Sequence, residues 1–244
     1  MSTIDKAATV GQLMVEQPGR SSVFERWGLD YCCGGRKPLN QACLEKGISL
    51  EAVVADLEGV TSTSSAFPEP DWNEVPLSVL ADHIVNTHHA YVRWSMPRLS
   101  AIIEKVCNAH GQRFDHLYEV REIFAVLRAE FEAHIAKEEM VLFPLIKQLE
   151  EMRELGVTSH IPSVRYPIAA MESEHETTGS ALEDIRRLTA NFTRPSGACN
   201  TYLAMLDGLN ALETDTHRHV HKENNILFVR AIDLELAGSS ATLQ

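Results

Sequence analysis

A histidine and a glutamate one helical turn apart occur twice in this chain, in two segments of similar sequence. The first segment is His134-Ile-Ala-Lys-Glu138, and the second, His219-Val-His-Lys-Glu223, begins 85 residues later. Residues four apart lie on one face of an α-helix, so each segment presents an imidazole and a carboxylate together. Two such segments facing each other would supply ligands for two metal ions.

Four stretches of the chain carry apolar side chains at alternating steps of three and four residues, which predicts four amphipathic helices. These stretches cover residues 85–106, 124–145, 168–192 and 202–226, with loops around Gly111, over Gly156–Pro162 and over 193–197. Four such helices joined by short loops predict an all-α fold, an up-down-up-down four-helix bundle. The candidate ligands fall on the core positions of these helices.

Each predicted helix has one histidine on its apolar face. His89 precedes His134 by 45 residues and His175 precedes His219 by 44, so the bundle reads as two similar helix hairpins. A buried carboxylate without a partner is costly, and a cation between the two glutamates would remove that cost. The predicted metal ligands are therefore His89, His134, Glu138, His175, His219 and Glu223.

Four imidazoles and two carboxylates without a thiolate disfavour a cysteine-rich zinc site and favour paired iron or manganese. We expect two ions with Glu138 and Glu223 as bridging carboxylates, two histidines on each ion and an oxo or hydroxo bridge. One position on each ion would stay open for oxygen, peroxide or nitric oxide.

Several neighbours of these six residues leave alternatives open. His88 adjoins His89, and His217 and His221 flank His219, so an error in helical register would exchange a ligand. Glu130 lies one helical turn before His134, and Glu174 adjoins His175. Either is a candidate to hydrogen-bond a ligand histidine or to line a polar route to the metals.

The overall composition limits the partners and the domain organisation. The 244 residues include 22 Lys and Arg against 34 Asp and Glu, a net charge of -12, which disfavours binding to nucleic acid and anionic membranes. No leader or membrane-spanning run is evident, which predicts a soluble cytoplasmic protein. The small, polar, proline-bearing stretch 61–72 predicts a linker between a helical domain (1–60) and the bundle (73–244).

Two adjacent cysteines, Cys32 and Cys33, precede a Gly-Gly pair in the predicted small domain. We expect reduced thiols before a flexible turn, since glycine accepts positive φ without a steric cost. A bond between adjacent cysteines would be strained, so the pair is a candidate for redox cycling, metal transfer or partner docking. The isolated Cys43, Cys107 and Cys199 are expected in the core.

Four motifs together resemble the di-iron "repair of iron centres" family, the ScdA/YtfE type. They are Asp30-Tyr-Cys-Cys-Gly-Gly35, Glu138-Glu-Met-Val-Leu-Phe-Pro144, Met171-Glu-Ser-Glu-His175 and Glu223-Asn-Asn-Ile-Leu-Phe228. The resemblance covers nearly the whole chain and implies a double-cysteine domain before a hemerythrin-like bundle, with iron on the six residues named above.

The resemblance also implies a function in the stress response: repair of iron-sulfur clusters damaged by nitrosative and oxidative stress, with iron-sulfur proteins as clients. We expect repair by iron donation. The alternatives are a protein that binds nitric oxide or oxygen, and an enzyme that reduces nitric oxide at the di-iron centre. A homodimer is also left open.

Overall fold

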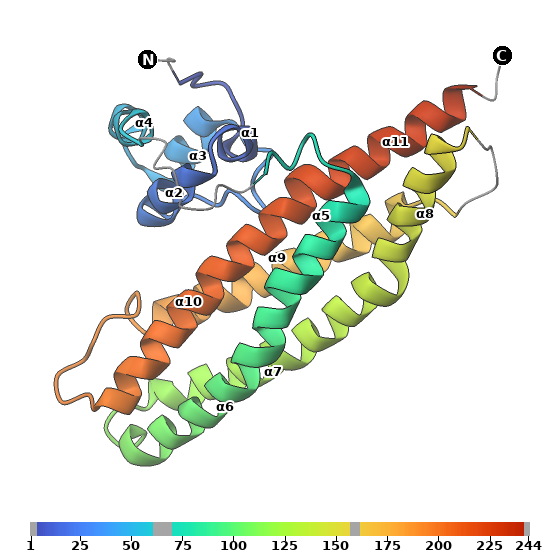
Figure 1. Cartoon of the computed structure of the whole chain (residues 1–244). Helices are drawn as coiled ribbons and strands as arrows, with labels where there is room; N and C mark the ends of the chain where they lie inside the picture. Colours follow the sequence, from blue (N-terminus) through green and yellow to red (C-terminus); the bar gives the residue numbers. More distant parts are fainter. Residues whose placement is uncertain (1–3, 61–69, 157–161, 242–244) are drawn as a thin grey trace.

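The computed structural model describes residues 4–60, 70–156 and 162–241, and these residues form helices and connecting loops without a strand. Figure 1 shows the long helices side by side, with a group of short helices packed against one flank. The all-α prediction is confirmed. No helix in the described ranges combines the length and the apolar character that a membrane span needs.

The short helices come first in the chain and share an apolar core that includes Leu13, Phe24 and Leu57. Sequence signals set their ends: Thr9 and Ser49 cap two helices by accepting backbone N–H groups, and Gly28 and Gly47 end two others in the left-handed conformation. The helices are α1 (Val10–Glu16), a 3-10 turn (Pro18–Arg20), α2 (Ser21–Trp27), α3 (Leu39–Lys46) and α4 (Leu50–Glu58).

Three of the four long helices contain a π-helical turn, which the sequence pattern did not predict. The first helix joins α5 (Leu77–Ile84), η2 (Val85–His89) and α6 (Ala90–His110), and the second joins α7 (His116–Lys137), η3 (Glu138–Leu142) and α8 (Phe143–Glu154). The third is α9 (Arg165–Leu188), and the fourth joins α10 (Asn200–Lys222), η4 (Glu223–Leu227) and α11 (Phe228–Ala241). Each π turn begins or ends at a predicted ligand, as such turns often do at functional sites.

Two sequence-based expectations about helix ends and loops have different outcomes. The third predicted helix, over 168–192, extends too far: α9 ends at Leu188. Ala190, Asn191 and Phe192 have φ of 48°, 56° and 54°. That backbone turns the chain toward α10. Most of the predicted linker and of the loop after Gly156 falls in residues 61–69 and 157–161, outside the described residues.

Two apolar clusters fill the bundle, one on each side of a polar layer. One contains Val92, Phe131 and Leu209, and the other contains Ile84, Phe143 and Phe228. Burial of these side chains supplies the main driving force for assembly of the four helices. The polar layer between the clusters holds the predicted metal ligands.

Asn225 of η4 is one of the polar side chains through which the short helices contact the bundle. The Asn225 amide donates to the backbone oxygens of Tyr31 and Cys32 at 3.3 and 3.1 Å. Gly11 and Gly35 make room for it, since a Cβ at either position would overlap the Asn225 amide. Gly35 therefore serves a close approach, and neither Gly34 nor Gly35 has a positive φ.

Candidate metal centre

The structure brings all six predicted ligand side chains together in the polar layer. His89, Glu138, His219 and Glu223 are fully buried, and His134 and His175 are 5% and 2% exposed. The residues come from all four long helices, so the bundle as a whole positions them.

The six side chains form two groups that share both carboxylates. One group is His89, His219, Glu138 and Glu223, and the other is His134, His175 and the same two glutamates; in each group the ligand atoms lie within 4.8 Å of one another. The Nε2 atoms of the two histidines face each other at 3.1 Å in the first group and 3.0 Å in the second. Each group has donor atoms that could hold a cation, and both groups include the same two carboxylates.

The donor atoms fit a cation better than they fit one another. Both Glu138 oxygens and Glu223 Oε2 are buried without a hydrogen-bond partner. The nearest imidazole nitrogens lie 3.3 and 3.4 Å from Glu138 but are poorly aligned for hydrogen bonds. Buried carboxylate oxygens left unpaired cost several kcal/mol. A pair of divalent or trivalent cations would satisfy all of these oxygens.

Charge coupling keeps the two carboxylates ionised despite their burial. Burial raises the pKa of Glu138, but the adjacent imidazoles outweigh burial and hold that pKa below its usual range. Burial also raises the pKa of Glu223, and the charges and contacts of His219 and His175 bring it well below the usual range. Ionised carboxylates are the form that binds metal.

Three of the four histidines are oriented by a partner on the ring nitrogen that faces away from the centre. His89 Nδ1 lies 2.7 Å from Glu139, His134 Nδ1 lies 2.9 Å from Glu174, and His175 Nδ1 donates to the Asn224 side-chain oxygen at 2.9 Å. Such partners fix the ring and leave Nε2 for a metal. His219 differs, since its Nδ1 is buried without a partner.

The two hairpins are equivalent around the π turns η3 and η4. Glu139 and Asn224 each follow a shared carboxylate, and each contacts the lone histidine of its own hairpin. Phe143 stacks on His89 and Phe228 stacks on His175, five residues after the shared carboxylates. The repeat Glu-Glu-Met-Val-Leu-Phe and Glu-Asn-Asn-Ile-Leu-Phe was the sequence signal for Glu139 and Asn224, which sequence reasoning missed.

The alternative histidines lie outside both groups. His88 stacks on His219 with ring centroids 5.3 Å apart, and it contacts Asp215 and Lys222. His221 faces the Tyr31 backbone oxygen, and His217 lies edge-on to the Tyr31 ring. Burial lowers the pKa of both His217 and His221.

The two acidic neighbours named from the sequence differ in position. Glu174 contacts His134 and also accepts from Lys137. Glu130 is exposed, and no contact with a histidine is recorded for it among the described residues. Glu130 therefore lies on the solvent side of α7, although it is one helical turn from His134. Glu139, with its side chain 25% exposed, contacts His89 instead.

The adjacent cysteines are free thiols beside the bundle, with Sγ atoms 3.8 Å apart. Asp30 organises their loop, because its carboxylate accepts the backbone N–H groups of Cys32, Cys33 and Gly34 and the Cys32 thiol. Contact with Cys33 and burial raise the pKa of the Cys32 thiol well above its usual range. Among the other cysteines, Cys43 and Cys107 are buried as expected, and Cys199 is exposed, which corrects the prediction of a core position.

Comparison with known proteins agrees with this architecture. Residues 80–231 match the model of the hemerythrin HHE cation binding domain, and residues 6–61 match the ScdA_N domain, a domain of unknown function. The fold and the buried His/Glu cluster thus define a cation-binding hemerythrin-like protein with an added N-terminal domain.

Relatives similar to both domains come from several bacteria. The chain is 35% identical to the iron-sulfur cluster repair protein YtfE of Escherichia coli O157:H7, and 34% identical to those of Enterobacter sp. (strain 638) and Citrobacter koseri. Each match spans 223 residues, 91% of this chain and 96% of the relative. The chain belongs to the YtfE family of iron-sulfur cluster repair proteins.

Proposed function

We propose that this protein holds two iron ions in the bundle and repairs damaged iron-sulfur clusters by donating iron. The observation that carries the di-iron assignment is the sharing of Glu138 and Glu223 by two histidine pairs. Shared carboxylates with imidazole ligands and no thiolate suit paired iron in helix bundles. His89 and His219 would hold one ion, and His134 and His175 the other.

The repair function is supported by the relatives and by the second domain. The relatives are named iron-sulfur cluster repair proteins and share both domains with this chain. A protein that only carried a gas would have no evident use for a thiol-bearing domain. Here that domain touches the centre, because Asn224 contacts both His175 and the Cys32 backbone oxygen.

Repair by donation is tested with a client enzyme whose cluster has lost iron. The iron-loaded protein is mixed with the apo client under anaerobic conditions, and recovery of client activity is compared with recovery from the same amount of free ferrous iron. A chelator too weak to strip the bundle suppresses the free-iron route. We expect recovery from the loaded protein and none from the Glu138→Ala variant; recovery no faster than from free iron would contradict donation.

A second candidate, binding or reduction of nitric oxide, is favoured by the ligand count. Six protein side chains shared by two ions leave coordination positions for small molecules. Two adjacent ferrous ions supply the two electrons needed to reduce two nitric oxide molecules. Catalytic nitrous oxide formation with an added reductant indicates the enzyme, whereas a reversible titration that saturates without product indicates a binding protein.

A further inference from the structure

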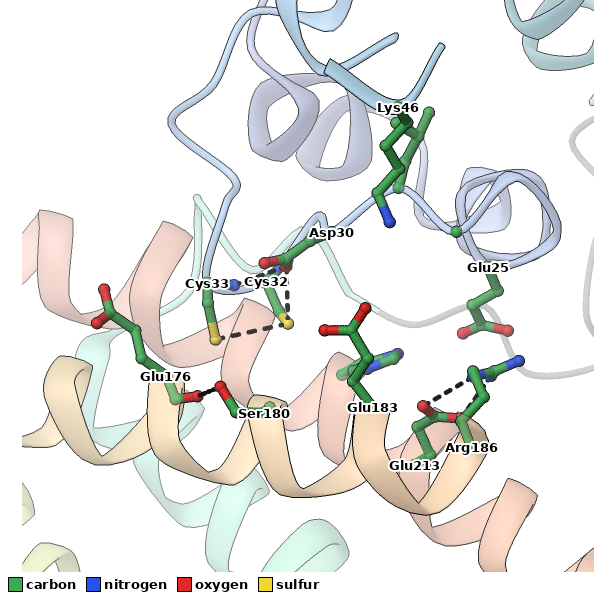
Figure 2. Close-up of a pocket in the computed structure, with 14 residues that line it drawn as sticks. Glu25, Asp30, Cys32, Cys33, Lys46, Glu176, Ser180, Glu183, Arg186 and Glu213 are labelled. Atoms are coloured by element: carbon green, nitrogen blue, oxygen red, sulfur yellow. Dashed lines mark hydrogen bonds and ion pairs between the residues drawn. The ribbon is translucent and has the colours of Figure 1, made fainter. Parts of the chain in front are cut away.

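A cavity of about 330 Å³ lies between the cysteine loop and α9 (Figure 2). The loop supplies Cys32 and Cys33 to one wall, and α9 supplies Gly179, Ser180 and Glu183 to the other. This cavity is separate from the polar layer of the bundle, and it places both thiols beside open space.

Three potential metal ligands converge at the loop side of the cavity. The Cys32 and Cys33 sulfurs and an Asp30 carboxylate oxygen all lie within 4.8 Å of one another. The Cys32 thiol donates a hydrogen bond to Asp30 Oδ1 at 3.2 Å. Loss of that proton would leave both the thiolate and a lone pair of the carboxylate available to a cation. Two thiolates and one carboxylate suit a borderline divalent ion such as ferrous iron or zinc.

The charge around the cavity attracts a cation. Five carboxylates line it against two basic side chains, and one of these, Arg186, is already paired with Glu213. Within the described residues, the carboxylates of Glu176 and Glu183 make no hydrogen bond or ion pair. Figure 2 shows Glu183 reaching from α9 toward the loop. A concave acidic lining concentrates cations.

The cavity also adjoins one half of the metal centre. Gly179 lies one helical turn after His175, and a Cβ there would be 3.9 Å from the Cys33 sulfur. From the other side, the Asn224 amide accepts from His175 at 2.9 Å and donates to the Cys32 backbone oxygen at 3.5 Å. A single side chain therefore separates the cysteine loop from a histidine of the His134/His175 pair.

We propose that Cys32, Cys33 and Asp30 form a second metal site, which receives a ferrous ion leaving the bundle before a client takes it. The inference rests on the proposed iron donation and names the exit site for it. Binding exchanges ligands without a change of oxidation state. The bonds of the ferrous ion to the bundle imidazoles and carboxylates break, two Fe–S bonds and one bond to the Asp30 carboxylate form, and the two thiol protons go to water. The client then removes the ion by supplying its own thiolates.

Cobalt(II) is the probe for this site, because thiolate-to-cobalt charge transfer gives near-ultraviolet bands. The protein is first loaded with iron in the bundle and then titrated with cobalt(II) without oxygen. We expect one cobalt ion per chain with thiolate bands, at least tenfold weaker binding in Cys33→Ser, and unchanged binding in the exposed-thiol control Cys199→Ser. Gly179→Leu keeps the thiols and fills the cavity, and should also weaken binding.

Two results would overturn the site: no thiolate-to-cobalt bands in the loaded protein, or equal bands in wild type and Cys33→Ser. Transfer is tested apart from binding, by the rate at which the loaded protein reactivates an apo client. Cys33→Ser should slow this rate at least tenfold with iron content unchanged. An unchanged rate would contradict the exit role, whereas failure of wild type to reactivate any client would contradict the proposed donation itself and leave the cobalt result intact.

Discussion

The two halves of the proposed metal centre have the same types of side chain but different surroundings. In the His134/His175 half, both histidines have a partner on Nδ1, and one of those partners also contacts the cysteine loop. In the His89/His219 half, only His89 has such a partner, and His219 is covered by the His88 ring.

The position of His88 accounts for this difference. His88 precedes His89 in the sequence, as Glu174 precedes His175. His88 therefore lies beside His219 in the position that corresponds to that of Glu174 beside His134. An imidazole there stacks on His219 and does not accept its N–H. The duplicated hairpin thus supplies equivalent candidate ligands, whereas single departures from the repeat give each half its own neighbours.

The largest effect is expected where the two halves overlap. Glu138→Ala or Glu223→Ala removes a ligand from both groups, so each should lower iron affinity by more than about 100-fold, beyond the loss typical of an outer partner. Metal analysis after gel filtration checks this. His110→Ala is the control, since His110 contacts Cys199 at the end of α6; equal iron in all three variants would refute the shared-carboxylate assignment.

The same position predicts an opposite effect on the metal-free protein. Glu138→Leu removes two buried oxygens that lack partners, so it should stabilise the apo protein by about 1–3 kcal/mol while abolishing iron binding. Chemical denaturation of wild type and variant without metal measures this difference. A clear loss of apo stability would show that Glu138 serves the fold rather than a cation.

An intermediate effect is expected from partners that belong to one half. Glu139→Ala and Asn224→Ala should each weaken iron binding by about 10–100-fold, at His89 and at His175 respectively. Only Asn224→Ala should also speed alkylation of Cys33, because Asn224 helps to hold the cysteine loop. Equal alkylation rates in the two variants would remove the proposed asymmetry.

A smaller effect is expected from His88, which contacts a ligand but lies outside both groups. His88→Gln preserves a hydrogen-bonding side chain near Asp215 and Lys222. Its iron affinity should change by less than about tenfold, which is below the 10–100-fold loss typical of a residue that hydrogen-bonds a ligand. Loss of iron comparable to that of His89→Ala would make His88 the ligand instead.

The smallest effect on the centre is expected from the Cys199–His110 contact. The hydrogen bond with His110 lowers the pKa of the exposed Cys199 to about 7, so the thiolate predominates above that pH. Alkylation by iodoacetamide should reach half its maximal rate near pH 7. His110→Ala should raise this midpoint and slow alkylation at pH 7 roughly tenfold. An unchanged midpoint would show that the hydrogen bond with His110 does not lower the pKa of Cys199. Iron content should stay the same.

Helical periodicity predicted the four long helices and placed all six candidate ligands in one layer, because spacing along an α-helix fixes which side chains share a face. It could not show that Glu139, the residue after Glu138, contacts His89. The π turn at Glu138 inserts an extra residue, and an inserted residue shifts the phase that the pattern assumes. The contact of Asn224 with both His175 and Cys32 joins residues far apart in sequence, which spacing does not encode.

Mössbauer spectroscopy of the protein loaded with iron-57, together with iron and protein analysis, tests the central claim most directly. Two iron sites per chain in equal amounts, magnetically coupled through shared ligands, are the predicted result for two groups that share Glu138 and Glu223. A single iron per chain, or two iron ions without coupling, would contradict the shared-carboxylate centre.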